Sequence, residues 1–152
     1  MNLSSDVITL LEGKTLATAE SCTGGGLGVA LTAVPGSSAV YKGGIISYTN
    51  WVKHVLLGVD AALLDREGAV SAPVAEAMAS GAKNALQADI AISVTGLAGP
   101  GGDSYGNPVG TVFIGYSDDV RVLRRKFVFY GDRSSVRKQA CRAALELLLE
   151  YL

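Results

Sequence analysis

Short apolar segments of strand character alternate along most of this chain with segments in which apolar residues recur at helical spacing. The strand-like segments span residues 15–19, 40–48 and 89–95, and the first and the third are typical of buried strands. The helical spacing predicts helices at 23–34, 51–57, 61–67 and 71–87, and a closing helix from Asp132 or Ser134 to Tyr151. A short first helix carries Val7, Leu10 and Leu11, with Ser4 or Ser5 as its cap and Gly13 at its end.

Two further strand-like segments, 109–116 and 121–130, are joined by a short Ser-Asp-Asp turn, which predicts an antiparallel pair. Strands alternate with helices in the first part of the chain, and a hairpin follows later. This order predicts an α/β fold: a three-layer α/β/α sandwich with a mixed sheet that includes a C-terminal antiparallel hairpin. No repeat or linker interrupts residues 1–152, so we expect a single domain. In such sheets ligands bind beyond the carboxyl ends of the strands.

Composition narrows the function classes. The chain is 49% hydrophobic and 18% charged, and Lys+Arg 13 against Asp+Glu 14 gives a net charge of −1. This balance argues against direct contact with nucleic acid. The start, MNLSSDVITLLEGK, lacks the features of a signal peptide, and no apolar run is long enough for a membrane span, so we expect a cytoplasmic protein. Cys22 and Cys141 lie too far apart in sequence to suggest a disulfide framework or a metal site.

The stretch ATAESCTGGGLGVAL places Ser21 at an expected strand-to-helix turn, directly before three glycines. A serine at such a turn suits a nucleophile, because the N–H groups that begin the next helix are unpaired and can hold an oxyanion or a phosphate. The simpler interpretation is that Ser21 or Thr23 caps the helix. Three successive glycines lower helix propensity by roughly 1 kcal/mol each. That cost is easier to understand if a ligand must approach the backbone closely at this point.

The base that would activate such a nucleophile is not obvious from the sequence. Cys22 is the better nucleophile by chemistry, but papain-like catalysis needs a histidine, and nothing local ties His54 to it. A lysine of lowered pKa can replace histidine, as in Ser–Lys hydrolases. Tyr48 and Lys53, in SYTNWVK, follow the second strand and are expected at the same sheet edge as Ser21, although a surface lysine is the simpler interpretation.

A second glycine-rich loop, TGLAGPGG, follows the third strand and begins at Thr95 and Gly96. Its N–H groups are suited to an anion-binding nest, and the alternative is an ordinary connecting loop. Arg133, Arg137 and Lys138 lie at the start of the closing helix, where cations oppose the helix dipole. A negatively charged ligand such as a phosphate would account for them, and a solvated face is the simpler alternative.

Several of these motifs occur together in the CinA C-terminal domain family. Six segments resemble that family, in the right order, over about residues 15–137: TAESCTGGGLG, VPGSSAVYKGGIISYTNWVKHVLLGV, GAVS, ISVTGLAGPGG, PVGTVFIGY and FYGDRSSVR. The resemblance implies a nicotinamide-nucleotide amidase, which hydrolyses nicotinamide mononucleotide to nicotinate mononucleotide and ammonia without a cofactor. Many relatives carry an additional N-terminal pyrophosphatase domain, and we do not expect that activity here.

The resemblance also implies roles for individual residues. Ser21 matches the nucleophile, and Tyr48 and Lys53 match the catalytic tyrosine and lysine. Backbone N–H groups around Cys22, Thr23 and Gly24 would hold the oxyanion. The positions implied for substrate binding are Ser38, Thr95 with Gly96, and Arg133, with Arg137 as a competing candidate for the phosphate. The chain departs from the family pattern at Trp51, Val52, Ala72 and Tyr105.

Other functions stay open at this point. The same site suits a hydrolase of another amide or ester, or a nucleotide-binding regulatory module without turnover. A purely structural domain would not need two glycine-rich loops at strand ends. We expect a small-molecule mononucleotide as substrate, no membrane partner, and, on general grounds, a homo-oligomer.

Overall fold

A five-stranded mixed sheet forms the centre of the molecule. The computed structural model describes residues 2–152, and its strands follow the order β2-β1-β3-β4-β5 across the sheet. The strands are β1 (Leu16–Glu20), β2 (Tyr41–Ile46), β3 (Ile90–Gly96), β4 (Thr111–Ser117) and β5 (Val122–Val128). β1 pairs in parallel with β2 and β3, whereas the β3–β4 and β4–β5 pairs are antiparallel. The predicted mixed sheet and late hairpin are confirmed.

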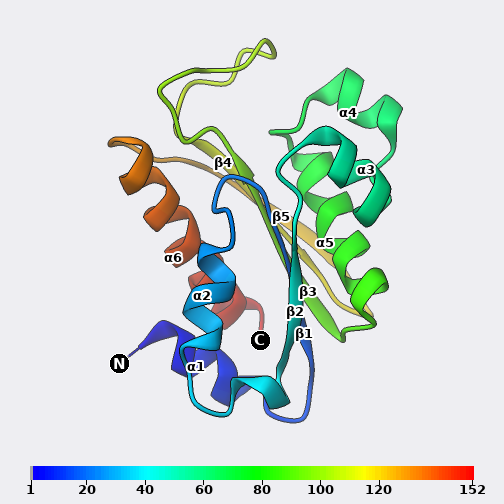
Figure 1. Ribbon diagram of the computed structural model, residues 1–152, viewed down its shortest axis with the longest axis vertical. Helices are drawn as coiled ribbons and strands as arrows, with labels where there is room; N and C mark the ends of the chain where they lie inside the picture. Colours follow the sequence, from blue (N-terminus) through cyan, green and yellow to red (C-terminus); the bar gives the residue numbers. More distant parts are fainter. Residues whose placement is uncertain (1) are drawn as a thin grey trace.

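Helices cover both faces of this sheet, as Figure 1 shows. One layer holds α1 (Leu3–Leu10), α2 (Gly26–Thr32) and α6 (Arg133–Tyr151), which pack on one another and on β1, β3 and β4. The other holds α3 (Asn50–Leu57), α4 (Ala61–Glu67) and α5 (Ala72–Leu86), with α5 lying across all five strands. The predicted three-layer α/β/α sandwich is therefore confirmed.

Small residues let α5 approach the sheet and its neighbouring helix closely. A Cβ on Gly115 of β4 would overlap the carbonyl oxygen of Ala75, and one on Gly81 would overlap that of Leu57. β1 is buried at all five positions because helices cover both of its faces. This packing of small side chains fixes the central strands, whose ends carry the site.

Some local predictions need correction. Asn2, and not Ser4 or Ser5, caps α1, because its side chain accepts hydrogen bonds from the N–H groups of both serines. α1 ends at Leu10, before Gly13. The helix predicted at 23–34 begins only at Gly26, and a short 3₁₀ helix, Ser37–Ala39, lies in the following connection. The glycines that precede α2 have positive φ angles, +58° at Gly24 and +102° at Gly25, which oppose helical continuation.

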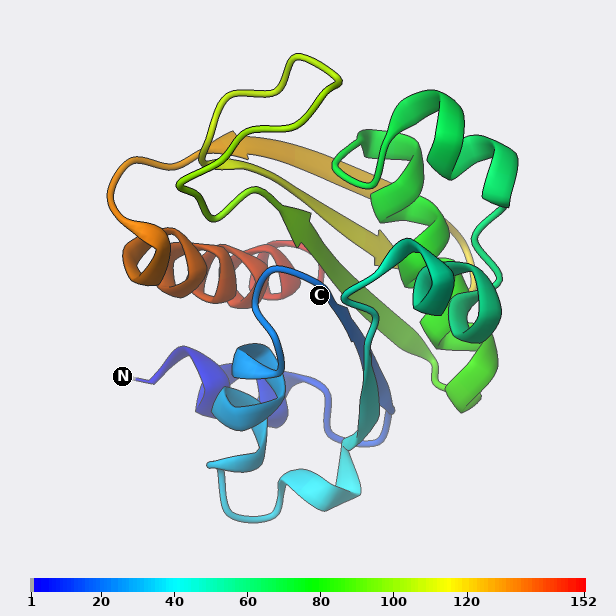
Figure 2. The same ribbon diagram turned by 45° about the horizontal axis from the view of Figure 1, so that its top comes forward.

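The carboxyl ends of β1, β2 and β3 lie at one edge of the sheet because these strands are parallel. Figure 2 shows the loop 97–110 standing above this edge, between the start of α6 and helix α4. Among residues 2–152 no helix combines the length and apolar character needed to cross a bilayer.

Candidate functional site

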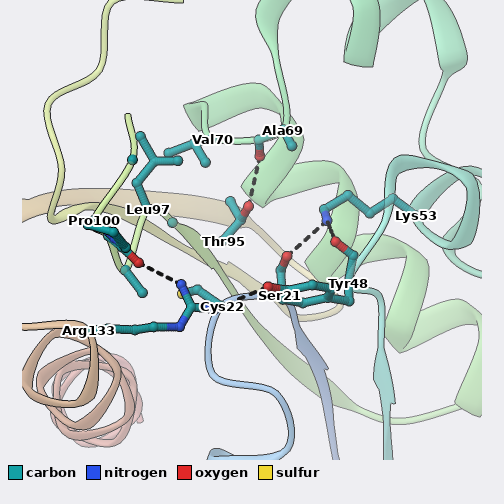
Figure 3. A pocket seen from close by; sticks show the side chains of 14 residues that line it. Ser21, Cys22, Tyr48, Lys53, Ala69, Val70, Thr95, Leu97, Pro100 and Arg133 are labelled. Carbon is teal, nitrogen blue, oxygen red and sulfur yellow. Dashed lines mark hydrogen bonds between the residues drawn. The ribbon is translucent and has the colours of Figure 1, made fainter. Parts of the chain in front are cut away.

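An open cavity of about 480 Å³ lies beyond the carboxyl ends of the three parallel strands. Its volume falls within the range of small-molecule sites. Its lining comes from five separate parts of the chain, whose side chains converge on it in Figure 3. The lining residues are Ser21, Cys22, Tyr48, Lys53, Ala69, Val70, Thr95, Gly96, Leu97, Ala98, Gly99, Pro100, Gly101 and Arg133. The fold thus brings seven predicted site residues to one cavity: Ser21, Cys22, Tyr48, Lys53, Thr95, Gly96 and Arg133.

Ser21 and Lys53 are in direct contact at the floor of this cavity (Figure 3). The Lys53 Nζ donates a hydrogen bond of 2.9 Å to the Ser21 Oγ and one of 2.6 Å to the backbone carbonyl of Ser47. Lys53 lies on the inner face of α3, and only 1% of it is exposed. α3 begins at Asn50 because the Thr49 side chain caps it, which aims position 53 back at the end of β1.

Burial changes the protonation of Lys53. Desolvation disfavours the ammonium and lowers the pKa of Lys53 to about 8, although the nearby Cys22 thiol acts in the opposite direction. Within residues 2–152 no carboxylate accepts a hydrogen bond from the Lys53 Nζ. A pKa near neutrality makes Lys53 suitable as a general base for the serine it touches.

The Cys22 thiol is poorly suited to nucleophilic attack. Cys22 is buried, and desolvation raises the pKa of its thiol to about 12. The thiolate is the reactive form, so this position favours Ser21 as the nucleophile. The His54 ring instead makes a 2.7 Å hydrogen bond to the carbonyl of Val59, and His54 does not line the cavity.

Tyr48 and Arg133 lie on opposite sides of the cavity mouth and meet across it. An Arg133 N–H donates to the Tyr48 hydroxyl at 3.2 Å, and another donates to the carbonyl of Gly99 at 2.7 Å (Figure 3). Tyr48 is 60% exposed, and its hydroxyl is bonded to Arg133 and not to Ser21 or Lys53. The aromatic ring therefore forms part of the entrance, with a cation beside it.

The turn between β1 and α2 is held by Glu20. Only 2% of Glu20 is exposed, and its carboxylate accepts hydrogen bonds from Thr23 Oγ1 (2.6 Å), Leu27 N–H (2.9 Å) and Gly28 N–H (3.0 Å). Thr23 therefore does not cap α2, and the first N–H groups of the helix are already occupied by a carboxylate. This role of Glu20 could not be predicted from the sequence, because a charged residue at the end of a buried strand has no distinctive local pattern.

The N–H groups left for an oxyanion lie in the turn itself. Gly24 N–H donates to the carbonyl of Ser21 at 3.1 Å and closes the turn. The N–H groups of Cys22 and Thr23 donate to no protein acceptor within residues 2–152. Both directly follow Ser21 in the turn, so they are the donors available to a charged oxygen formed beside Ser21.

The wall opposite Ser21 is formed by the second glycine-rich loop. The Thr95 hydroxyl donates to the carbonyl of Ala69 at 2.8 Å, which joins the end of β3 to the segment before α5. Asn107 donates to the carbonyl of Val70 at 3.0 Å, and the Tyr105 hydroxyl donates to that of Asp65 at 2.7 Å. Tyr105, a departure from the family pattern, thus ties the loop to α4.

Four of the residues predicted to bind the substrate do not line this cavity: Thr23, Gly24, Ser38 and Arg137. Thr23 and Gly24 belong to the turn, where the Gly24 N–H is bonded to the carbonyl of Ser21 and is not a free donor. Ser38 is exposed in the 3₁₀ helix before β2, at the end of the sheet opposite Ser21. Arg137 lies behind the turn, where its Nε donates to the carbonyl of Cys22 at 3.0 Å and a terminal N–H donates to that of Thr23 at 3.3 Å. Of the two candidate arginines, only Arg133 lines the main cavity.

Comparisons with known proteins agree on one family. The family model described as CinA C-terminal domain matches residues 2–152. A CinA-like protein of Parasynechococcus marenigrum (strain WH8102) is 50% identical over 155 residues, which cover 99% of this chain and 37% of that protein. A CinA-like protein of Mycolicibacterium gilvum is 49% identical, over 99% of this chain and 36% of that protein. The chain therefore spans about a third of the length of these curated relatives.

Solved structures share the fold closely. A competence-damaged protein (CinA) superfamily protein from Escherichia coli superposes with a TM-score of 0.97 at 38% identity, covering 99% of this chain and 89% of that chain. The competence/damage inducible protein CihA from Agrobacterium tumefaciens gives 0.92 at 42% identity, covering 97% of this chain and 92% of that chain.

Proposed function

The chain belongs to the CinA C-terminal domain family, and on that premise we propose that it hydrolyses the carboxamide of nicotinamide mononucleotide, giving nicotinate mononucleotide and ammonia. The observation that carries the proposal is the buried contact of 2.9 Å between Lys53 Nζ and Ser21 Oγ. A nucleophile within hydrogen-bond reach of a base of lowered pKa is the arrangement that acyl transfer requires.

The proposed reaction has two halves. Neutral Lys53 takes the proton of the Ser21 hydroxyl while Oγ attacks the carbonyl carbon of the amide, and the Lys53 ammonium then gives that proton to the departing nitrogen, which leaves as ammonia. Water attacks the resulting ester, Lys53 accepts a proton from the water, and returning it to Oγ releases the carboxylic acid, which gives its remaining proton to ammonia or solvent and becomes the carboxylate. Protons and electrons balance without a cofactor.

The charged oxygen of each tetrahedral intermediate would be held by the N–H groups of Cys22 and Thr23, which have no other acceptor in the described residues. A site of this kind lowers the barrier because its donors already face the position where charge develops. Loss of one such donor typically costs about 10²–10³ in kcat.

The remainder of the cavity suits a mononucleotide. Arg133 lines the mouth of the cavity, where its guanidinium can bind a phosphate. The loop from Gly96 to Gly101 lines the same cavity. Tyr48, exposed beside Arg133, offers an aromatic face for a pyridine ring. In this arrangement the amide points inward to Ser21 and the phosphate points outward.

Product identification tests the reaction. The purified chain is incubated with nicotinamide mononucleotide, nicotinamide riboside or free nicotinamide, and the pyridine products are separated by chromatography while ammonia is assayed. We expect nicotinate mononucleotide and ammonia in equal amounts from the mononucleotide alone. Turnover of a different amide would support another hydrolase on the same site, and mononucleotide binding without product would support the regulatory module.

A further inference from the structure

Arg137 contacts the reactive turn without lining the main cavity. Its guanidinium donates to the carbonyls of Cys22 (3.0 Å) and Thr23 (3.3 Å), two successive peptide groups. It also lines a second cavity of about 340 Å³ with Thr23, Gly26, Ser134, Lys138 and Cys141. A Cβ on Gly24 would lie 3.2 Å from the guanidinium, so glycine leaves room for the arginine to reach the turn.

These contacts fix the direction of the N–H groups on the other side. A trans peptide is planar, and its C=O and N–H point in opposite directions. The carbonyl of Cys22 points at Arg137, so the Thr23 N–H of the same peptide group points away from Arg137. This N–H has no protein acceptor in the described residues.

The second contact acts one step further along the turn. The carbonyl of Thr23 accepts from Arg137 at 3.3 Å and from the Gly26 N–H at 2.9 Å, and the Gly24 N–H of the same peptide group points the opposite way, onto the carbonyl of Ser21. That bond of 3.1 Å fixes the Ser21–Cys22 peptide group and with it the direction of the Cys22 N–H. The guanidinium therefore orients the Thr23 N–H directly, and it contributes, together with the Gly26 N–H, to the orientation of the Cys22 N–H through the turn.

We propose that Arg137 is a positioning residue for the oxyanion donors and does not bind the substrate phosphate. The inference rests on the proposed amidase function. A cation on a carbonyl oxygen polarises the whole peptide group, which makes its N–H a stronger donor to a developing negative charge. Glu20 holds the other end of the turn through Thr23 Oγ1 and the start of α2, so the loop is fixed from two sides.

The experiment compares Arg137→Ala and Arg137→Lys with Arg142→Met, a control that removes an exposed positive charge of the same helix outside both cavities. We measure kcat and KM for nicotinamide mononucleotide, and the rate at which a small phosphonofluoridate labels Ser21. That probe has no nucleotide phosphate, and its phosphoryl oxygen occupies the oxyanion position when Oγ displaces fluoride. Thermal unfolding of each variant verifies that it is folded.

We expect Arg137→Ala to lower kcat by about 10²-fold with KM within about threefold of the wild type, and to slow labelling by a similar factor. Added methylguanidinium should restore part of both rates through the second cavity, which a general loss of structure would not allow. Arg137→Lys should be intermediate, because a lysine cannot span both carbonyls. Arg142→Met should match the wild type.

Two results would overturn the inference while leaving the amidase intact. One is a KM raised tenfold or more in Arg137→Ala with normal labelling, as expected for a phosphate ligand. The other is wild-type kcat and labelling in that variant. A wild-type chain that neither releases ammonia nor reacts with the probe would overturn the proposed function, and this inference with it.

Discussion

The Lys53 ammonium donates a hydrogen bond of 2.9 Å to the Ser21 hydroxyl, although the two residues are 32 positions apart and come from a helix and a strand end. The lysine is 1% exposed, and its nitrogen is held from behind by the carbonyl of Ser47. A buried lysine with no carboxylate partner is costly to keep charged. That cost sets the protonation on which the proposed catalysis depends.

The first prediction concerns the pH dependence of the rate. With a pKa of about 8 for Lys53, roughly a tenth of the side chain is neutral at pH 7, several hundredfold more than for an ordinary lysine. We therefore expect kcat/KM for the mononucleotide to rise about tenfold per pH unit below pH 8 and to level off above pH 9.

The control is Lys53→Arg, which keeps a positive charge that does not titrate in this range. It should be inactive at every pH tested. A wild-type profile that stays flat between pH 6 and 9 would argue that Lys53 is not the base.

The second prediction concerns stability. The folded protein releases the Lys53 proton near pH 8, whereas the unfolded chain holds it up to an ordinary lysine pKa of about 10.4. Because the unfolded state binds more protons in this window, the free energy of unfolding gains up to about 1.4 kcal/mol per pH unit from Lys53 as the pH rises.

Denaturant titrations of the wild type and of Lys53→Met at pH 7, 8, 9 and 10 isolate this contribution, because other groups titrate equally in both. The free energy of unfolding of the wild type should rise relative to that of Lys53→Met by ~2–3 kcal/mol from pH 7 to pH 10. A constant difference would mean that burial does not shift the pKa of Lys53.

The third prediction concerns Glu20. The carboxylate oxygens of Glu20 accept hydrogen bonds from Thr23 Oγ1 and from the first N–H groups of α2. In Glu20→Gln, an amide NH₂ replaces one of these oxygens. We expect a loss of ~2 kcal/mol in the free energy of unfolding, since a buried donor is left facing another donor. Glu12→Gln, an exposed change of the same chemistry, should stay within about 0.5 kcal/mol of the wild type. Equal stability of the two variants would contradict the tethering role.

The fourth prediction separates Arg133 from the rest of helix α6. Arg133→Met should raise KM for nicotinamide mononucleotide by about 10–100-fold, the value of a charge-assisted hydrogen bond to phosphate, with a smaller effect on kcat. Arg142→Met removes an exposed arginine of the same helix that pairs with Glu146, and should leave KM unchanged. Steady-state kinetics that give both variants the same KM would remove Arg133 from the phosphate site.

Much of the fold could be predicted from the sequence because the layers follow local hydrophobic patterns. β1 and β3 read as buried strands, and the antiparallel β4–β5 pair follows from its short turn. The start of α2 could not be located in this way. α2 begins only at Gly26 because of the positive φ angles of the two preceding glycines and the hydrogen bonds of the Glu20 carboxylate. Neither feature can be seen in the spacing of apolar residues.

The site was predictable where the fold alone decides position. Ser21, Lys53, Thr95 and Arg133 meet because parallel strands end at one edge. Arg133 and Arg137 could not be separated from the sequence, since residues four apart share one helix face. Only the structure places the first at the cavity mouth and the second behind the turn.

The most direct test of the Ser21–Lys53 assignment is ammonia release from nicotinamide mononucleotide by the wild type and by Ser21→Ala, each verified as folded and titrated for mononucleotide binding. Removing the hydroxyl deletes one atom from a cavity that otherwise keeps its lining, so the variant should still bind the mononucleotide. We predict ammonia from the wild type and at least a 10³-fold lower rate from Ser21→Ala. A variant that releases ammonia at the wild-type rate would contradict the account, because the amide would then be cleaved without the Ser21 hydroxyl.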